Sequence, residues 1–374
     1  MGKILILSDI NSIHTIRWVK SLSNRGMDVS VFSFTKLKNE KTLNELNGIK
    51  IYTANHDKSI LIKKDVKKWF GYTRFLGMLK RVIKEYQPDI LHAHYVSSYG
   101  LLGALSNFSP FALSIWGSDV FIFPKRSIIH RMVFKYILNR ANAVFSTSKV
   151  MAKEANKYIK KQIEVIPFGI DLNKFRKMQV DSVFGKDALV VGTVKHLEKV
   201  YGIDKLIRSF YLVKKRNPDL PLKLLIVGGG SLEQEMKSLV KELDIDRDTV
   251  FTGAVPFDEI PKYLNMLDVY VALSNVESFG VAVLEASACE LPVVVSDVGG
   301  LPEVVINNET GFIVPNGNID KAAESIEFLI KNSDKAEKMG RNGREFVKEK
   351  YQWENNVETL VLKYNELLSK PNNK

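Results

Sequence analysis

The feature that most constrains the fold is an alternation of short apolar, β-branched runs with longer amphipathic stretches. This alternation occurs twice, beginning with KILILSDI at residues 3–10 and restarting with ALVVGTV at residues 188–194. After the first run, HTIRWVKSLSNRG predicts a helix that ends at Gly26. Strands separated by helices indicate parallel pairing, so the pattern predicts an α/β protein with two doubly wound, Rossmann-like domains.

The other predicted strands belong to the same two series. They cover residues 28–34, 89–95, 111–119, 143–148 and 163–169 in the first half, and residues 223–230, 250–255, 268–274 and 292–300 in the second. We expect residues 1–170 to form the N-terminal domain and residues 171–350 the C-terminal domain, with helices in 351–374 packing back on the first. Ligands of such sheets bind beyond the carboxyl ends of the strands, so an interdomain cleft is the expected site.

Charge is distributed unevenly between the two halves. Residues 1–180 contain 30 Lys and Arg against 12 Asp and Glu, residues 181–374 contain 24 against 30, and the net charge is +12. Part of the basic, aromatic-rich segment 58–86 is expected to be an ordinary core helix, and its remainder, with segment 121–135, favours an anionic membrane surface as partner of the N-terminal half. Nucleic acid is disfavoured because no recognition motif accompanies the charge. A single cysteine, Cys289, and the lack of an apolar run of ~20 residues favour a cytoplasmic protein.

Three strands of the second half run into turns that open predicted helices. The turns VGGG (227–230), NVESFG (275–280) and DVGG (297–300) precede SLEQEMKSLV, VAVLEASACE and LPEVVIN, and Pro302 suits a first helical turn. Helix starts offer unpaired N–H groups and the positive end of a dipole. Three of them at one sheet edge predict an anion site.

The second of these turns carries a pair of glutamates. Glu277 falls in the turn and Glu285 falls on the apolar stretch that follows, where a buried carboxylate needs hydrogen-bond donors such as sugar hydroxyls. Gly280 between them permits close approach of the backbone to a ligand. Taken alone, a solvated Glu277 and a Glu285 bound to an internal N–H is the simpler interpretation.

In this context the chain resembles the family 4 glycosyltransferases (glycosyl transferases group 1), which are retaining, nucleotide-sugar-dependent enzymes of the GT-B fold. The resemblance covers nearly the whole chain and is strongest in the second half. It includes VVGTVKHLEKVYGIDKLI, LLIVGGGSLEQEM, VFTGAV, ALSNVESFGVAVLEASACELPVVVSDVGGLPEVV and TGFIVP. The Glu-x7-Glu element in this setting is far more specific than a lone glycine-rich loop.

The resemblance implies a donor site in the second half. Glu285 would hold the nucleotide ribose, and Glu277, with the following backbone, would hold the donor sugar. The implied donor-binding set is Gly229, Gly230, Val255, Ser278, Phe279, Gly280, Val281 and Glu285, with Glu277 also counted as catalytic.

The resemblance also implies acceptor-side residues in the first half. His94, the second histidine of LHAHY, matches a family histidine that lines the reaction centre, and is expected to be catalytic. Asp119 in IWGSD matches a loop near the acceptor, with a helix N-cap or turn role as an equal alternative. The turn SDINSIHT lacks the paired glycines often found there, so Ser12 and His14 are expected to narrow acceptor access.

A second departure from the family pattern concerns the leaving group. Family members carry an Arg and a Lys that neutralise the leaving diphosphate, and alignment places His196 and Tyr201 at these positions. The neighbouring Lys195 and Lys199 are the expected replacements and are counted as catalytic.

No metal or other cofactor is expected. The Asp-x-Asp spacing in DIDRD (244–248) lies between a helix end and a strand, where an aspartate-rich turn needs no metal. His92 and His94 alternate onto one face of a strand, but no third ligand cluster accompanies them. A dinucleotide dehydrogenase is disfavoured because neither SDINSIH nor VGGGSLEQE has G-x-G-x-x-G spacing.

The expected activity is retaining transfer of a hexosyl or N-acetylhexosaminyl group from a nucleotide sugar, UDP-linked, to a glycan or lipid-linked acceptor. The setting would be cell-surface polysaccharide or glycoconjugate synthesis at the inner face of the cell membrane. The resemblance suggests that the leaving diphosphate assists deprotonation of the acceptor. The alternatives are a GT-B-type nucleotide-sugar epimerase or phosphorylase, and a non-catalytic nucleotide-sugar-binding module favoured by His196 and Tyr201.

Overall fold

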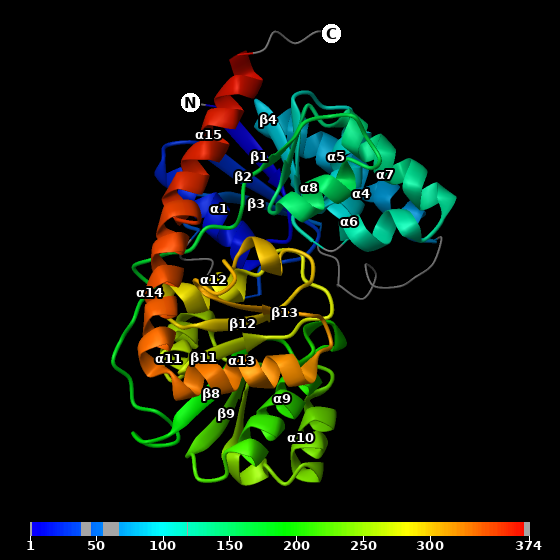
Figure 1. The fold of residues 1–374 in the computed structure, drawn as a ribbon. Coiled ribbons are helices and arrows are strands. Elements are labelled where there is room, and N and C mark those ends of the chain that lie inside the picture. The colour runs from blue at the N-terminus through cyan, green and yellow to red at the C-terminus, as the bar shows by residue number, and fades with distance from the viewer. Residues whose placement is uncertain (1, 39–45, 55–66, 118, 370–374) are drawn as a thin grey trace. The chain divides into compact units, whose positions relative to one another are not determined.

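The chain divides into two compact units, each built on its own parallel sheet (Figure 1). The computed structural model describes residues 2–38, 46–54, 67–117 and 119–369. The N-terminal unit comprises Met1–Phe168 with Glu354–Lys374, and the C-terminal unit comprises Gly169–Trp353. The fold class is therefore α/β with two Rossmann-like sheets, as the double alternation predicts.

The sheet of the N-terminal unit has seven strands in the order β3-β2-β1-β4-β5-β6-β7. The strands are β1 (Lys3–Leu7), β2 (Asp28–Ser33), β3 (Lys50–Thr53), β4 (Ile90–His94), β5 (Phe111–Ile115), β6 (Ala143–Ser146) and β7 (Ile163–Val165). All their pairings are parallel. The sequence did not predict β3, whose short KIYT run is only half-buried at the sheet edge and gives a weak apolar signal.

Helices connect these strands. They are α1 (Ile13–Asn24), α4 (Lys67–Tyr86), α5 (Leu101–Ser106), α6 (Asp119–Ile122), α7 (Ile128–Arg140) and α8 (Lys149–Ala155), with a π-helix η1 (Tyr95–Gly100) and a 3₁₀ turn η2 (Phe123–Lys125). The predicted stop at Gly26 is confirmed: its φ is +77°, and its N–H donates to the Ser23 carbonyl at 2.8 Å. Glycine suits this position because it adopts positive φ without a Cβ clash.

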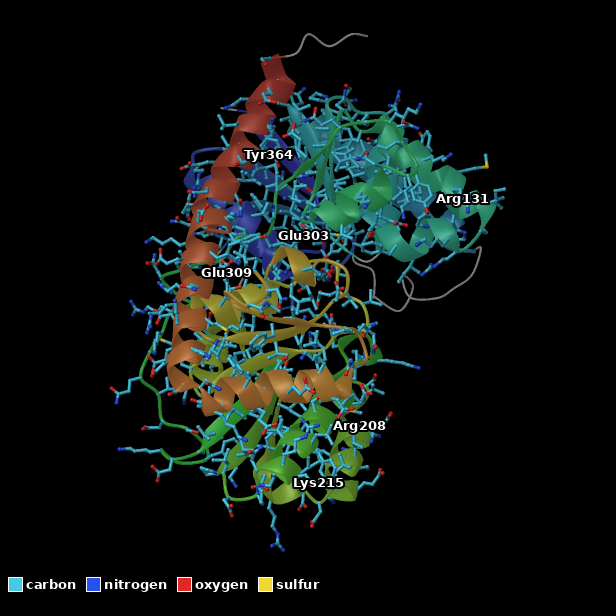
Figure 2. The ribbon with its side chains drawn as sticks, in the orientation of Figure 1. Arg131, Arg208, Lys215, Glu303, Glu309 and Tyr364 are labelled. Carbon is cyan, nitrogen blue, oxygen red and sulfur yellow. The ribbon has the colours of Figure 1, made fainter. Side chains whose placement is uncertain are left out.

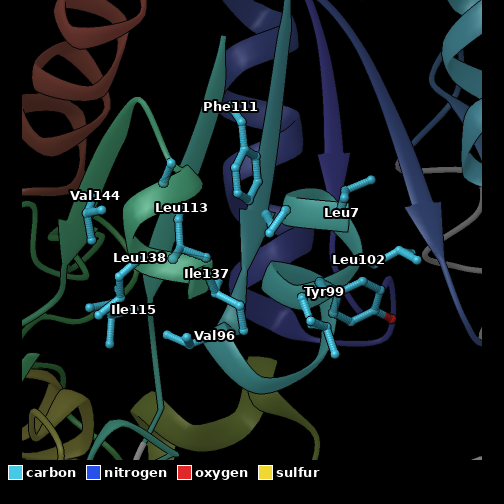
Figure 3. Close-up of a cluster of buried hydrophobic side chains, with 14 of the residues drawn as sticks. Leu7, Val96, Tyr99, Leu102, Phe111, Leu113, Ile115, Ile137, Leu138 and Val144 are labelled. Carbon is cyan, nitrogen blue, oxygen red and sulfur yellow. The ribbon is translucent and has the colours of Figure 1, made fainter. Parts of the chain in front are cut away.

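The core of the N-terminal unit lies between the sheet and these helices (Figure 3). Leu7, Phe111, Leu113, Ile115 and Val144 from the strands pack with Val96, Tyr99, Leu102, Ile137 and Leu138 from the helices. Phe75 and Leu79 of α4 belong to the same core, so this part of segment 58–86 is the core helix that the sequence predicts. Residues 58–66, from the same predicted surface, lie outside the described residues.

The last helix of the chain, α15 (Trp353–Ser369), belongs almost entirely to the N-terminal unit. The hydroxyl of the fully buried Tyr364, labelled in Figure 2, lies 2.5 Å from Nδ1 of His92 on β4. Arg25 and Glu354 form an ion pair nearer the start of the helix. Residues far apart in the sequence thus complete one core.

The sheet of the C-terminal unit has six parallel strands in the order β10-β9-β8-β11-β12-β13. The strands are β8 (Leu189–Val194), β9 (Leu222–Val227), β10 (Thr249–Gly253), β11 (Val269–Ala272), β12 (Val293–Ser296) and β13 (Gly311–Val314). The helices are α9 (Ile203–Arg216), α10 (Glu233–Glu242), α11 (Ile260–Leu264), α12 (Val281–Ala288), α13 (Ile319–Lys331) and α14 (Ser333–Lys350). The 3₁₀ turns are η3 (Lys199–Tyr201), η4 (Asp246–Asp248), η5 (Phe257–Glu259) and η6 (Leu301–Glu303).

One predicted helix of this unit is wrong in length. LPEVVIN forms only the 3₁₀ turn η6, with Pro302 in its first positions. Val304, Val305 and Ile306 follow, and β-branched side chains lose rotamer freedom in a helix. Only two of the three predicted helix starts, those of α10 and α12, therefore lead into helices of two turns or more.

Both sheets reverse strand order at one point. In the N-terminal unit β1 lies between β2 and β4, and in the C-terminal unit β8 lies between β9 and β11. In doubly wound sheets, ligands bind beyond the carboxyl ends of the strands at this switch point. The loops after β1 and β4, and after β8 and β11, are therefore the places to look for a site.

Candidate functional site

An ion pair spans the switch point of the C-terminal unit. Lys195 follows β8 and Glu277 follows β11, and the two strands are neighbours. Lys195 Nζ lies 2.5 Å from Glu277 Oε2, and each side chain is only 11% exposed. The Lys195 ammonium also lies 4.6 Å from the centroid of the Tyr201 ring, within cation–π range.

The ion pair keeps Lys195 charged. Burial lowers the pKa of the ammonium, but the nearby Glu277 carboxylate opposes burial and leaves the pKa above its ordinary value. Lys195 therefore carries a full positive charge at neutral pH, close to a sheet edge where a diphosphate could bind.

The structure separates the two candidate lysines. The side chain of Lys199 in η3 is exposed, and its carbonyl accepts a hydrogen bond from Asn275 Nδ2 at 2.6 Å. His196, at the position of the family arginine, is also exposed, whereas Tyr201 packs on the Lys195 ammonium. The geometry thus groups Lys195, Tyr201 and Glu277, and leaves Lys199 and His196 outside this group.

The glycine-rich turn after β9 holds the Lys195 loop at close range. A Cβ on Gly228 would lie 2.0 Å from the Lys195 carbonyl oxygen, and one on Gly230 would lie 2.6 Å from the Leu197 nitrogen. Leu197 N–H donates to the Gly229 carbonyl at 3.1 Å. Gly228 and Gly230 are therefore required by packing of loop against loop, whatever Gly230 contributes to a donor.

The other predicted donor residues of this edge are less crowded. A Cβ on Gly229 would approach nothing closer than 3.4 Å, so a methyl group there would make only ordinary packing contacts. Val255 is half-buried after β10. Gly228 N–H donates to the Gly253 carbonyl at 2.9 Å and so joins the loop after β9 to the end of β10.

A second glycine pair positions the Glu277 turn. A Cβ on Gly299 would lie 1.7 Å from the Glu277 carbonyl oxygen, and one on Gly300 would lie 2.7 Å from the Phe279 Cα. Gly300 N–H also donates to the Glu277 carbonyl at 3.1 Å. The turn DVGG thus supports the Glu277 turn by packing against its backbone. This role was not predicted from the sequence, where DVGG was interpreted as a helix start.

Backbone conformation explains why a glycine occupies position 280. Its φ is +114°, and it stands at the N-cap of α12, whose first residue is Val281. A Cβ there would also meet Leu301 and Val304 side chains at 3.0 Å. Ser278 and Phe279 precede it, with Phe279 buried.

Glu285 lies on α12 and is only 6% exposed, as its apolar surroundings in the sequence predict. Its carboxylate acts on the fully buried Tyr270 of β11. Burial, reinforced by the charges of Glu285 and Glu277, raises the pKa of the Tyr270 phenol to about 12. The carboxyl edge of this sheet therefore contains two carboxylates, a charged lysine and a neutral phenol.

In the N-terminal unit, an aromatic stack joins the loops at the switch point. The His94 ring, at the end of β4, stacks on Trp116 with centroids 3.6 Å apart. Trp116 meets Phe168 edge-on at 5.1 Å, and Phe168 stacks on His14 at 4.0 Å. The structure therefore brings His94 and His14 into one cluster, with Trp116 and Phe168 between them.

The histidines of this cluster are neutral at physiological pH. Burial lowers the pKa of His14 to about 4 and holds that of His94 well below its usual range. Nδ1 of each ring is buried without a hydrogen-bond partner among the described residues. A neutral imidazole with an unused nitrogen can donate to or accept from a hydroxyl group.

His92 differs from His94 in that both of its ring nitrogens are engaged. Nδ1 lies 2.5 Å from the Tyr364 hydroxyl and Nε2 lies 2.8 Å from Ser114 Oγ. Its role is structural in this arrangement. Within the described ranges, no group of three His, Cys, Asp or Glu side chains is placed to hold a metal ion.

Asp119 uses one carboxylate oxygen to hold the start of η1. Oδ2 accepts hydrogen bonds from the N–H groups of Val96 at 3.1 Å and Ser97 at 3.0 Å. Burial raises the pKa of this carboxyl, opposed by those hydrogen bonds. The geometry matches the turn-stabilising alternative for Asp119, although the capped turn is η1 and not the helix in which Asp119 lies.

Two features at this edge of the N-terminal sheet were not predicted from the sequence. Tyr95 follows His94 with φ at +70°, a conformation uncommon for a residue with a Cβ, and begins a π-helix, a form frequent at functional sites. Its hydroxyl bonds to Ser12, which stands at the N-cap of α1 without capping it through its own side chain. Trp116 entered the prediction only as part of the segment IWGSD, because the sequence does not show which aromatic rings Trp116 contacts.

The aspartate-rich segment DIDRD has a local explanation. Asp248 forms ion pairs with Lys214 at 2.7 Å and Lys223 at 2.6 Å. These two lysines lower the pKa of the carboxyl against the effect of burial. Asp248 is thus bound to lysines from the adjacent helix and strand.

Among the described helices, none is both long enough and apolar enough to cross a lipid bilayer.

Comparison with known proteins places this arrangement in a family. The model described as "Glycosyl transferases group 1" matches residues 174–346, and the one described as "Glycosyl transferase 4-like" matches residues 3–148. An uncharacterised glycosyltransferase of Methanocaldococcus jannaschii is 28% identical over 84% of this chain and 88% of the relative. The capsular polysaccharide biosynthesis glycosyltransferase CapM of Staphylococcus aureus is 28% identical over 95% of this chain and 94% of CapM.

Two further comparisons extend this result. The GDP-mannose-dependent phosphatidylinositol monomannoside mannosyltransferase of Mycolicibacterium smegmatis is 31% identical over 51% of this chain, a match that spans only 53% of that relative. The crystal structure of Anabaena HepE with UDP and glucose has a TM-score of 0.81 at 19% identity, covering 98% of this chain and 100% of HepE. This likeness shows the GT-B fold. The chain therefore belongs to the group 1 glycosyltransferases of family 4.

Proposed function

We propose that this glycosyltransferase moves a hexosyl or N-acetylhexosaminyl group from a UDP-sugar to a glycan or lipid-linked acceptor, with retention of anomeric configuration and without a metal cofactor. The observation that carries the proposal is the Lys195–Glu277 pair at the switch point, with Glu285 buried on the following helix. A cation, a turn carboxylate and a helix carboxylate suit diphosphate, sugar and ribose respectively.

In this reaction the acceptor hydroxyl attacks the anomeric carbon on the face from which the diphosphate leaves. The carbon–oxygen bond to phosphate breaks as the new glycosidic bond forms, and the hydroxyl proton passes to the departing phosphate oxygen. Lys195 stabilises the negative charge that develops on the leaving group, because its ammonium is charged and largely withdrawn from water. His94, at the end of β4, is the proposed catalytic histidine of the N-terminal unit, because its neutral ring can exchange a hydrogen bond with a substrate hydroxyl.

The UDP donor is supported by the HepE structures, which contain UDP, UDP with glucose, or UDP-glucose. The GDP-mannose dependence named for the mycobacterial relative supports a different base. A donor screen must therefore include both nucleotides. The name of CapM supports a role in cell-surface polysaccharide synthesis, which would place the protein at the inner face of the membrane, with its basic half toward anionic lipid.

Two variants test the assignment. Glu285→Ala should weaken nucleotide-sugar binding at least ten-fold, and Glu277→Ala should mainly lower turnover, because loss of a charged hydrogen-bond partner costs about 1.5–3 kcal/mol. Binding would be measured by calorimetry and turnover by release of nucleotide, across a panel of UDP- and GDP-sugars. Correctly folded variants with wild-type affinity and rate would refute the proposed site.

The same panel separates the alternatives. An epimerase would convert the donor sugar without transfer, and a phosphorylase would require inorganic phosphate. A binding module, the alternative that His196 and Tyr201 favour, would bind a nucleotide sugar without consuming it. Chelator should leave the rate unchanged, and activity restored only by manganese would contradict the metal-free mechanism.

A further inference from the structure

Helix α7 exposes an apolar face that the described residues of its own unit do not cover. Of the thirteen large hydrophobic side chains exposed in the described part of the chain, five lie between residues 122 and 136. Ile128 is 72% exposed, Met132 65% and Ile129 61%, with Ile122 and Tyr136 close behind. Single exposed apolar residues are ordinary on a soluble protein, but four of these five lie on α7, and a cluster of this kind on one helix marks a surface for interaction.

The exposed residues form one stripe on α7. At about 100° per residue, Ile128, Met132, Tyr136 and Ile129 fall within about 100° of helix arc. Phe134, Ile137 and Leu138 fall on the opposite side and are fully buried in the core of the N-terminal unit. The helix is thus anchored by one apolar face and presents a second one outward, which packing within its own unit does not require.

Basic side chains border the stripe. Arg131 (Figure 2) and Lys135 lie along one side, and Arg140 lies on the other. The sequence contains no Asp or Glu from Val120 to Lys153. The carboxylate that follows, Glu154, pairs with Lys125 and Lys157, so it does not neutralise the charges on α7.

We infer that the outer face of α7 inserts into an anionic bilayer surface, with Ile128, Ile129 and Met132 below the headgroups and Arg131 and Lys135 among them. This inference rests on the proposed function only in placing the acceptor at a membrane. Apolar side chains bordered by cations match the boundary between acyl chains and anionic headgroups. Nucleic acid would meet the cations but leave the isoleucines without apolar partners.

A second copy of the chain fits this surface less well. In a two-fold dimer the same patch faces itself, so the basic borders would be brought together without an acidic residue from this segment to separate them. An anionic bilayer supplies the opposite charge and the apolar layer together. The charge distribution therefore favours lipid as the occupant.

The test compares three variants with wild type by co-sedimentation with phosphatidylcholine vesicles, with and without phosphatidylglycerol, over a series of salt concentrations. The triple variant I128Q/I129Q/M132Q removes the apolar stripe, and R131Q/K135Q removes its basic border. Leu362→Gln is the matched control, since Leu362 is 61% exposed on α15 of the same unit. All the substituted side chains are exposed, so the fold should be retained.

We expect wild type and Leu362→Gln to bind only the anionic vesicles, and the triple variant to bind them at least about ten-fold more weakly. R131Q/K135Q should bind more weakly at low salt and lose much of the salt dependence. Wild-type vesicle binding by the triple variant would overturn the inference, as would failure of wild type to bind any vesicle. A wild-type dimer in sedimentation equilibrium that the triple variant abolishes would assign the face to a second copy instead.

Turnover in solution keeps this result separate from the proposed function. Hydrolysis or transfer of the donor to a water-soluble acceptor should be the same in wild type and the triple variant. A protein that binds vesicles through α7 but consumes no nucleotide sugar would refute the proposed function and leave the α7 surface intact.

Discussion

Lys195 is held between a carboxylate and an aromatic ring, so its ammonium is in place before any ligand arrives. The ring belongs to Tyr201, which the sequence resemblance matches to a family lysine, and it packs against Lys195. Tyr201 thus contributes no positive charge of its own, but its ring supports the charge of Lys195. This arrangement suggests how the chain keeps a positive charge at the switch point without the family's usual pair.

We therefore expect Lys195→Ala to weaken binding of UDP by ten-fold or more, because a charged hydrogen bond contributes about 1.5–3 kcal/mol. Lys199→Ala should change affinity by less than about two-fold, since its side chain is exposed and surface charges contribute little. Titration calorimetry at one salt concentration measures both. A larger loss for Lys199→Ala than for Lys195→Ala would reverse the assignment.

The buried histidines make stability depend on pH. Their folded-state pKa values are lowered, to about 4 for His14 and about 3 for His92, so the unfolded chain takes up protons first as the pH falls below about 6.5. Stability should be fully present above that pH and decline below it. At pH 5, His14 alone accounts for a loss of about 2 kcal/mol by this linkage.

Urea unfolding at pH 7.5 and pH 5 measures this loss. His14→Phe keeps an aromatic ring against Phe168 but cannot titrate, so its stability should fall less between the two pH values. An equal fall in wild type and variant would show that His14 does not take part.

At this scale the sequence predicted the buried state of Glu285 and named Lys195 as one of two candidate cations, and the structure pairs Lys195 with Glu277. The sequence could not choose between Lys195 and Lys199, because the choice depends on which side chain turns toward Glu277 in three dimensions. Nor could it reveal the stack of His94, Trp116 and Phe168, whose members lie at or just after the ends of three different strands.

At the scale of elements, the loops that carry the candidate donor site are held by close backbone packing. Gly299 and Gly300 lie directly against the turn that contains Glu277, and Gly228 lies against the Lys195 carbonyl. Such contacts have no room for a methyl group. The loops are therefore rigidly coupled to one another, as a site that must orient a diphosphate and a sugar requires.

Gly300→Ala tests this coupling. Its Cβ would meet the backbone of Ser278 and Phe279 at 2.7 Å, so we expect about 1–3 kcal/mol of destabilisation and weaker donor binding. Gly77→Ala is the control: this glycine lies in α4 with nothing within 4 Å of its Cβ position, and the change should stabilise the protein by about 0.5–1 kcal/mol. Thermal unfolding and calorimetry with UDP measure both quantities. Unaltered donor affinity in Gly300→Ala would show that the loop tolerates displacement.

The elements themselves were predictable where the signal was strong. Apolar runs located most of the strands, and Gly26 located the end of α1, because buried parallel strands and glycine caps have local physical causes. The edge strand β3 was not predicted, and the short turn η6 was predicted as a longer helix. In both, the outcome depends on neighbours that a local pattern does not contain, such as the pairing of β3 with β2.

At the scale of the whole molecule, the two units have separate cores. One cluster of buried residues runs from Leu5 to Ile163 and the other from Val191 to Met339, and neither includes residues of the other unit. The double alternation in the sequence predicted two cores for this reason. The sequence also shows the uneven charge, but the exposed apolar stripe that basic residues border on α7 could be recognised only from the structure.

Separate cores lead us to expect two transitions in scanning calorimetry. UDP at one hundred times its dissociation constant should stabilise the C-terminal unit by about 2.7 kcal/mol and raise only one of the transitions. Glu285→Ala should reduce that rise. A single transition that shifts as a whole would show instead that the units unfold together.

The contact between Tyr364 and His92 has a consequence for the order in which the protein is made. Residues 2–168 leave the ribosome first, yet the helix that closes their core is synthesised only after the whole C-terminal unit. The C-terminal unit is continuous in sequence and can complete its core while translation continues. The N-terminal unit is therefore synthesised first but completes its fold last. Its strand β4 stays partly exposed until α15 has been synthesised and packs against it. Any chaperone that assists this protein during synthesis should meet the N-terminal unit in that unfinished state.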